Sequence, residues 1–259
     1  MNKEGVFMME NYLNKDYVAT ISDIDFNFEF NLVGLMREFQ DLATRHSKEM
    51  GLSYFDLKQN DNAFWVLSKI KVKFLQDLPK WGDKFSILTY PLEPTNVRYG
   101  RNFKMSTKDG PTAIIGSSEW CILDLDTRKI RRTNTISSNP MNFDYISERL
   151  ESESYTIIDD TQDDELLPLF EKVVRSTDLD INLHMNNVVY TKIVLDCFDA
   201  IFLQKNKIKE YELHFLKEAQ EGAKIDIFKK QVEDGYVVYG KSKDKSFSYF
   251  KAKIKFERK

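Results

Sequence analysis

The chain has 259 residues and a formal net charge of −3 from 38 basic and 41 acidic residues, a balance that disfavours a binder of duplex nucleic acid. Hydrophobic residues make up 42% and charged residues 31%, which indicates a folded chain with length for one large or two smaller domains. No apolar run approaches the roughly 18 residues of a membrane span, and the start of the chain lacks the apolar core of a secretory signal. The two cysteines make no disulfide framework. We therefore expect a cytoplasmic protein.

The first half of the chain reads as a polar loop, one long helix and four strands. The loop, DIDFNFEFN, spans residues 23–31, and apolar residues recur at helical spacing from Leu32 to Met50 before Gly51 supplies a C-terminal stop. Alternation and enrichment in Val, Ile, Phe and Tyr predict strands after the helix. The strand-like segments are residues 63–75, 81–92, 97–110 and 112–126. Strands that follow a helix in a run indicate an α+β fold rather than a doubly wound parallel sheet.

The middle of the chain, residues 132–172, is polar and acidic, and we expect it to be a linker whose acids form a solvated face. One short helix is expected within it, near residues 143–150. This division predicts an N-terminal domain at residues 1–131 and a C-terminal domain at residues 173–259.

The second half repeats the polar loop of the first, 155 residues later in the chain. The second loop, DLDINLHMN, spans residues 178–186 and matches the first at four polar positions. The matching pairs are Asp23 and Asp178, Asp25 and Asp180, Asn27 and Asn182, and Asn31 and Asn186. The seventh position differs, because the second loop has His184 where the first has Glu29.

Helix-like and strand-like segments follow the second loop in the same order as in the first half. The apolar stripe of the helix consists of Val189, Ile193, Cys197 and Ile201. The strand-like segments are residues 210–219, 222–235, 236–244 and 246–258. Each half is therefore predicted to be a long helix wrapped by an antiparallel sheet.

A metal site is one interpretation of the second loop, since Asp178, Asp180 and Asn182 occupy the first, third and fifth places of a calcium loop. The sixth place requires Gly and holds Leu183, and the twelfth requires Glu and holds Val189. The three histidines show no spacing typical of zinc ligands. We therefore expect neither a metal nor a cofactor.

A helix-capping turn and an active site are the remaining interpretations of this loop. Asn186 is a suitable N-cap, and for the first loop the capping interpretation is sufficient. His184, however, lies just before a helix N-terminus, where free N–H groups favour a developing oxyanion. A histidine transfers protons near neutral pH, and Asp180 and Asn182 are placed to orient it or to donate a hydrogen bond. The residues alone leave both interpretations open.

The second loop with its flanks resembles the active-site segment of acyl-ACP thioesterases from plants and bacteria. Their motif, Arg-Ser-Asp-x-Asp-x-Asn-x-His-x-Asn-Asn with Tyr shortly after, corresponds to residues 175–190 with Thr177 as one extra residue. Three other segments resemble the family in the same order: WGDKFSI at 81–87, SSEWCILDLDTRKIRR at 117–132 and LHFLKEA at 213–219. The resemblance covers nearly the whole chain.

The resemblance implies a tandem of two hotdog domains, the first supplying an apolar tunnel for the acyl chain and the second the catalytic residues. Carried over by motif, the catalytic set is Asp180, Asn182, His184 and Glu218. The implied reaction is hydrolysis of a long- or medium-chain acyl-ACP thioester, which releases free fatty acid and ends chain elongation. An acyl-CoA thioesterase and a non-catalytic acyl-binding module on the same fold remain alternatives.

Water is the expected nucleophile of this reaction. Many family members have Cys directly after the catalytic Glu, whereas this chain has Ala219 there. Glu218 and His184 together would polarise the water, and either one is a candidate general base. The oxyanion would be stabilised by Asn182 and by backbone N–H groups at the helix N-terminus. The residues of that N-terminus are Asn186, Asn187 and Val188.

The implied partner is acyl carrier protein bearing an acyl-phosphopantetheine, an acidic protein that requires a basic docking surface. Its candidate docking residues are Arg128, Lys129, Arg131 and Arg132. A rival patch consists of Lys205, Lys207 and Lys209. Met36, Phe39 and Met50 with strand residues 64–74 are candidates to line the tunnel or to form the core. The two halves are expected to pack as an internal pseudo-dimer, so a monomer or a homodimer is compatible with the sequence.

Overall fold

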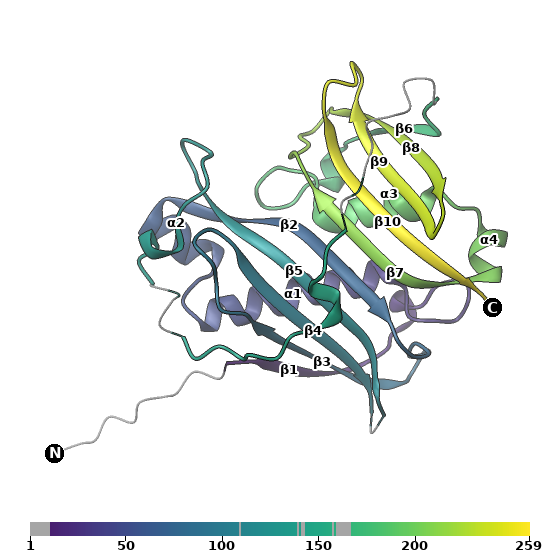
Figure 1. Ribbon diagram of the computed structural model, residues 1–259, viewed down its shortest axis with the longest axis horizontal. Coiled ribbons are helices and arrows are strands. Elements are labelled where there is room, and N and C mark those ends of the chain that lie inside the picture. The colour runs from purple at the N-terminus through teal and green to yellow at the C-terminus, as the bar shows by residue number, and fades with distance from the viewer. Residues whose placement is uncertain (1–10, 109, 139, 141–142, 157, 159–166) are drawn as a thin grey trace.

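The computed structural model describes residues 11–259 except residues 109, 139, 141–142, 157 and 159–166. Its strands form one ten-stranded antiparallel sheet in the order β1-β3-β4-β5-β2-β7-β10-β9-β8-β6 (Figure 1). The first half contributes β1 (Leu13–Val18), β2 (Ala63–Phe74), β3 (Lys84–Pro91), β4 (Tyr99–Thr107) and β5 (Thr112–Asp124). The second half contributes β6 (Phe170–Val173), β7 (Asn206–Phe215), β8 (Lys224–Val232), β9 (Gly235–Ser242) and β10 (Ser248–Arg258).

The two halves join edge to edge at β2 and β7. These strands pair antiparallel, with Lys69 opposite His214 and Lys73 opposite Glu210. The pairing satisfies the backbone groups that each half would otherwise leave open at a sheet edge. The predicted α+β fold of two tandem hotdog units is therefore confirmed, and the two sheets are continuous.

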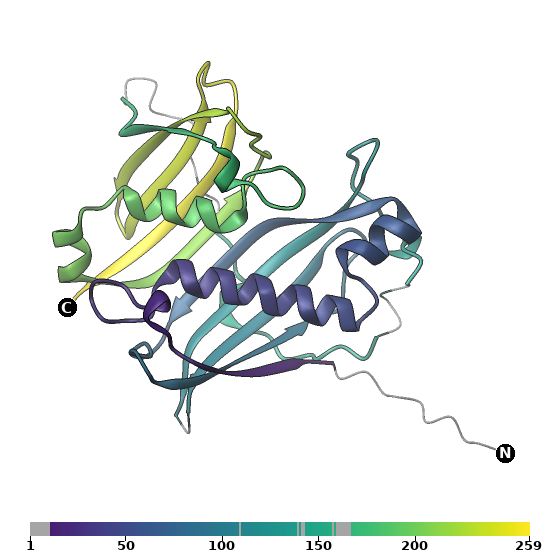
Figure 2. The same cartoon turned by 180° about the vertical axis from the view of Figure 1, so that it is seen from behind.

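One long helix crosses the sheet in each half. In the first, α1 (Leu32–Glu49) begins at Asn31, whose side chain accepts the Gly34 N–H, and it ends before Gly51, which has a φ of 68°. In the second, α3 (Asn187–Asp196) is capped by Asn186. Figure 2 shows α1 and α3 on the same face of the sheet. The remaining helices are α2 (Tyr54–Asp61) and α4 (Ala200–Lys205), with short 3-10 turns at Ile21–Asp23, Thr133–Thr135, Glu151–Glu153 and Ser176–Asp178.

The second helix is shorter than its apolar stripe predicted. The chain leaves α3 after Asp196 and starts α4 at Ala200, because the Asp199 side chain accepts the Phe202 N–H and caps a new helix. Ile201 is consequently 63% exposed instead of being part of the stripe.

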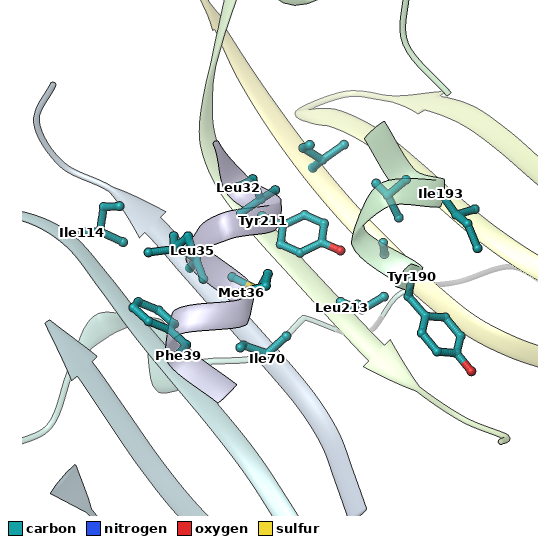
Figure 3. Close-up of a cluster of buried hydrophobic side chains, with 14 of the residues drawn as sticks. Leu32, Leu35, Met36, Phe39, Ile70, Ile114, Tyr190, Ile193, Tyr211 and Leu213 are labelled. Atoms are coloured by element: carbon teal, nitrogen blue, oxygen red, sulfur yellow. The ribbon is translucent and has the colours of Figure 1, made fainter. Parts of the chain in front are cut away.

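Side chains from both helices and from the central strands form one apolar core that continues across the seam between the halves (Figure 3). Leu35 and Phe39 of α1, Ile70 of β2, Leu213 of β7 and Ile193 of α3 are all buried in it. Burying one side chain of this size contributes roughly 1.5–3 kcal/mol. The same apolar layer therefore stabilises each half and the contact between them.

The predicted helix at residues 143–150 is wrong, because residues 144–150 have no helical structure. This segment follows the outer face of the sheet, where Glu148 pairs with Lys104 at 2.6 Å. Glu153, just beyond it, accepts the Asn102 amide at 2.7 Å. These acids bind the sheet rather than forming only a solvated face. Residues 170–172, which we assigned to the linker, belong to β6 because they pair with β8.

Candidate active site

Asp180 shapes the second polar loop through the backbone. Its Oδ1 accepts the N–H groups of Asn182 at 2.8 Å and His184 at 3.3 Å. Leu183 completes the turn with a φ of 60°. Within the described part of the chain, Asp180 makes no hydrogen bond to the His184 ring. Asp180 therefore fixes the backbone of His184. We had expected it to orient the imidazole directly, and it does not.

The loop lies against the segment that follows β7, and this contact places His184 beside Glu218. The Met185 N–H donates to the Ala219 carbonyl at 2.8 Å, and His184 forms a bridge with Gln220. His184 Nε2 lies 3.5 Å from Glu218 Oε2. The His184 side chain is 14% exposed and that of Glu218 33%, so the pair lies at a boundary between protein and solvent.

The N-terminus of α3 offers fewer oxyanion donors than the sequence suggested. The Val188 N–H already donates to Asn186 Oδ1 at 2.9 Å, and the Asn186 N–H donates to the Asp178 carbonyl at 2.8 Å. Of the three candidates, only the Asn187 N–H has no partner among the described residues. The Asn187 amide also donates to Gln40 of α1 at 3.3 Å, which ties this end of α3 to the first half.

A cavity of about 630 Å³ opens at His184 and Glu218 and extends into the first half. Most of its exposed lining is apolar, and its aromatic lining residues are Tyr54, Phe64, Trp65, Tyr99, Trp120, Tyr145, Tyr190 and Phe215. Met50 and the start of β2, which were candidates for the tunnel or for the core, line it. Met36 and Phe39 do not line it, because they face the core.

Arg101 is a cavity residue that the sequence analysis did not single out. It is 6% exposed, and its Nη1 lies 3.0 Å from Nδ1 of His46. Burial lowers the pKa of Arg101 to about 10. Nothing in the local pattern indicates this position, because Arg101 stands in a strand and meets His46 only through the packing of β4 on α1.

The four candidate docking residues have different environments. Arg128 lines the cavity and donates a hydrogen bond to Glu218, with its guanidinium carbon 4.8 Å from the centre of the Phe64 ring. Arg131 donates to the Asp61 carbonyl at 2.9 Å and so has a structural role. Lys129 and Arg132 are exposed.

The rival basic patch lies away from His184 and Glu218. Lys207 pairs with Asp77 at 2.9 Å and lines a different cavity, while Lys209 pairs with Glu257 at 2.9 Å. Of the two basic clusters, only the one at residues 127–132 contributes a residue to the cavity that holds His184.

Neither cysteine lines this cavity. Cys121 lies in β5 and donates to the Val66 carbonyl, and Cys197 is buried at the end of α3. Burial raises the pKa of Cys121 to about 11 and that of Cys197 to about 12. A thiol with such a pKa is a poor nucleophile at neutral pH. Among the described residues there is also no group of three or more His, Cys, Asp or Glu side chains placed to hold a metal.

Both halves of the chain match models of known protein families. Residues 10–136 match the family model described as the acyl-ACP thioesterase N-terminal domain, and residues 161–257 match that of the C-terminal domain. The chain belongs to the acyl-ACP thioesterase family. No helix within the described residues is long and apolar enough to cross a membrane.

Curated relatives of this family are plant enzymes of low identity. A chloroplastic palmitoyl-acyl carrier protein thioesterase from Cuphea hookeriana is 23% identical over 232 residues, which cover 83% of this chain and 52% of that protein. A chloroplastic oleoyl-acyl carrier protein thioesterase 2 from Arabidopsis thaliana is 22% identical over 238 residues, covering 86% and 63%. The chain thus spans about half to two thirds of the length of these relatives.

Solved structures of the family share the fold over nearly their whole length. An acyl-ACP thioesterase from Bacteroides thetaiotaomicron is 26% identical with a TM-score of 0.84, covering 95% of this chain and 98% of that one. A 12:0-ACP thioesterase from Umbellularia californica is 14% identical with a TM-score of 0.83, covering 96% and 98%. At 14% identity, the likeness to the Umbellularia protein shows a shared fold and no more.

Proposed function

We propose that this protein hydrolyses the thioester of long- or medium-chain acyl-acyl carrier protein and thereby releases free fatty acid and ends chain elongation. The observation that carries the proposal is the His184–Glu218 pair, 3.5 Å apart, at the mouth of a mainly apolar cavity of about 630 Å³. Such a cavity accommodates an alkyl chain, and the pair supplies proton transfer where the chain would enter. The name of the Bacteroides relative supports the same substrate class.

The reaction proceeds by attack of water on the thioester carbonyl carbon. Glu218 and His184 polarise the water, and one of them accepts a proton as the new C–O bond forms. The tetrahedral intermediate then collapses, the C–S bond breaks, and the leaving thiolate takes up the proton. Fatty acid and the free thiol of the carrier are the products. No acyl-enzyme bond is formed, in keeping with the positions of the two cysteines away from the cavity.

The oxyanion of the intermediate is stabilised by the Asn182 amide and the Asn187 N–H, both from residues that line the cavity. Neither group has a partner among the described residues, so neither must give up an internal hydrogen bond. One donor of this type typically contributes roughly 3 kcal/mol to transition-state stabilisation.

Acyl carrier protein with its acyl-phosphopantetheine is the proposed partner. Lys129 and Arg132 are exposed in the basic cluster that contributes Arg128 to the cavity lining, and we assign them to contact with the acidic partner. A first domain at residues 1–131, a linker that ends before β6 and a second domain that begins with β6 at residue 170 complete the proposal, with a monomer or homodimer as the assembly. A cytoplasmic location is supported by the two free cysteines.

The test measures free thiol release from palmitoyl-ACP and palmitoyl-CoA at matched concentrations, with the native protein and His184→Ala. Rapid release from the ACP substrate that is lost in the variant supports the function and the site together. A preference for CoA transfers the assignment to an acyl-CoA thioesterase. No release from either substrate, over a range of chain lengths, favours an acyl-binding module and contradicts the mechanism.

A further inference from the structure

Arg128 belongs to a well-defined turn that follows β5, in the first half of the chain. Asp124 Oδ1 accepts both the N–H and the hydroxyl of Thr127, each at 2.9 Å. The Arg128 N–H donates to the Asp124 carbonyl at 3.0 Å, and Arg128 has a φ of 58°. A non-glycine residue in this left-handed region is uncommon. The hydrogen bonds of the turn hold the Arg128 backbone in this conformation and so fix the position from which its side chain extends.

The Arg128 side chain crosses from the first half to Glu218 in the second. Its guanidinium lies over the Phe64 ring, with 4.8 Å from Cζ to the ring centre, and its Nη2 donates to Glu218 Oε2. The same Oε2 is the atom that lies 3.5 Å from His184 Nε2. One carboxylate oxygen is therefore engaged by the cation and faces the imidazole, and Oε1 has no partner among the described residues.

We infer that Arg128 is a positioning residue for the hydrolytic reaction, supplied by the half that otherwise holds the acyl chain. It holds Glu218 with Oε2 toward His184, and Oε1 is left to accept a hydrogen bond from the attacking water. Charge-assisted hydrogen bonds from a guanidinium to a carboxylate are short and directional, which suits this role. The inference rests on the proposed function and assigns the active site to both halves.

A docking cation and a positioning residue have different kinetic consequences. Removal of a docking cation weakens binding of the acidic carrier protein, so KM rises for acyl-ACP and a substrate without the carrier is unaffected. Removal of a positioning residue lowers kcat for every thioester, because Glu218 is displaced from its working geometry. Arg132 serves as the docking comparison, since it is exposed in the same basic cluster, does not line the cavity and is proposed to contact the carrier protein.

The experiment measures kcat and KM for the native protein, Arg128→Ala, Arg128→Lys and Arg132→Ala. The substrates are an acyl-ACP and an acyl-N-acetylcysteamine thioester of the same chain length, which has no carrier protein. We expect kcat to fall about tenfold or more in Arg128→Ala with both substrates, partial recovery in Arg128→Lys, and in Arg132→Ala a rise in KM for the acyl-ACP alone. Arg128→Gln, which keeps an N–H donor on a shorter and uncharged side chain, replaces Arg128→Ala if the latter does not fold.

Two outcomes would overturn the inference while leaving the proposed function intact. In one, Arg128→Ala raises only KM and only for the acyl-ACP, which makes Arg128 a docking residue. In the other, Arg128→Ala leaves both kcat and KM unchanged. An inactive native protein, with both substrates, contradicts the proposed function itself and the inference with it.

Discussion

The two polar loops share one backbone design and differ in their chemistry. Asp25 and Asp180 each use Oδ1 to accept the N–H groups of the residues two and four positions later. Phe28 and Leu183 occupy the same position and have φ values of 62° and 60°. Each loop ends in an Asn that caps the following helix. The Asp and Asn residues that both loops contain therefore build the turn, and the residues that differ determine what each site can do.

The surroundings of the loops are also equivalent. Two consecutive N–H groups just before Asp77 donate to the Ala113 carbonyl, as the two before Glu218 donate to the Tyr249 carbonyl. Asp77 therefore occupies in the first half the place that Glu218 has in the second. Both sites have an acid after the seam strand, so the acid alone does not distinguish them.

A second cavity, of about 290 Å³, accompanies the first loop. Two of its acids are paired with lysines from the second half: Glu29 with Lys259 at 3.4 Å and Asp77 with Lys207 at 2.9 Å. The site at the first loop thus has Glu29 and Asp77 where the site at the second has His184 and Glu218. Only the second site has an imidazole, and under the proposed function this difference explains why only the second loop would be catalytic.

Exchange of the residues at the position where the two loops differ, Glu29 and His184, gives the largest expected effect on activity. His184→Glu makes the second loop resemble the first, and we expect thioesterase activity to fall at least ~100-fold because general acid–base catalysis is lost. Glu29→His alone is expected to leave activity unchanged. The measurement is thiol release from acyl-ACP by both variants and by the double exchange. Restored activity in the double exchange would show that the two sites are interchangeable and would contradict the comparison.

The seam strands provide the second comparison, because Lys71 of β2 and Glu212 of β7 lie directly opposite each other. Both are buried, and their charged atoms are 3.1 Å apart. Burial on its own raises the pKa of Glu212, but hydrogen bonds from His214 and the Thr156 N–H, together with Lys71, outweigh it. The pKa of Glu212 in the folded protein therefore lies below its ordinary value.

Glu212→Gln is expected to lower the free energy of unfolding by about 2 kcal/mol at pH 7. Since the folded pKa of Glu212 is depressed, its contribution is present above the unfolded pKa of ~4.3 and is lost as pH falls through the folded value. The difference between native protein and variant should therefore shrink below that pH. Urea titrations at several pH values test this, with Lys207→Met at an exposed ion pair as control. A difference that is constant with pH would contradict the assignment.

Features set by neighbouring residues were predictable from the sequence, whereas features set by contacts between distant residues were not. Both loops, α1 and the strands β2–β5 and β7–β10 were predictable because alternation, capping residues and Gly51 act over a few positions, whereas the edge strands β1 and β6 were not predicted. The proximity of His184 and Glu218 followed from the family resemblance. The extended path of residues 144–150 was not predictable, because Glu148 binds Lys104, a residue 44 positions away. The same holds for Arg128, which stands 90 positions from the carboxylate that it contacts.

The loop aspartates give the smallest and most discriminating effect. Asp25→Ala and Asp180→Ala each remove a carboxylate that accepts two backbone N–H groups, so each should lower the free energy of unfolding by about 1–2 kcal/mol. Only Asp180→Ala should also lower kcat, since only that loop holds His184 in place. Thermal or urea unfolding gives the first quantity and thiol release the second. Equal losses of stability with unequal losses of activity would follow from a shared turn with a single working site. A loss of activity in Asp25→Ala as large as that in Asp180→Ala would mean that the first loop takes part in the reaction.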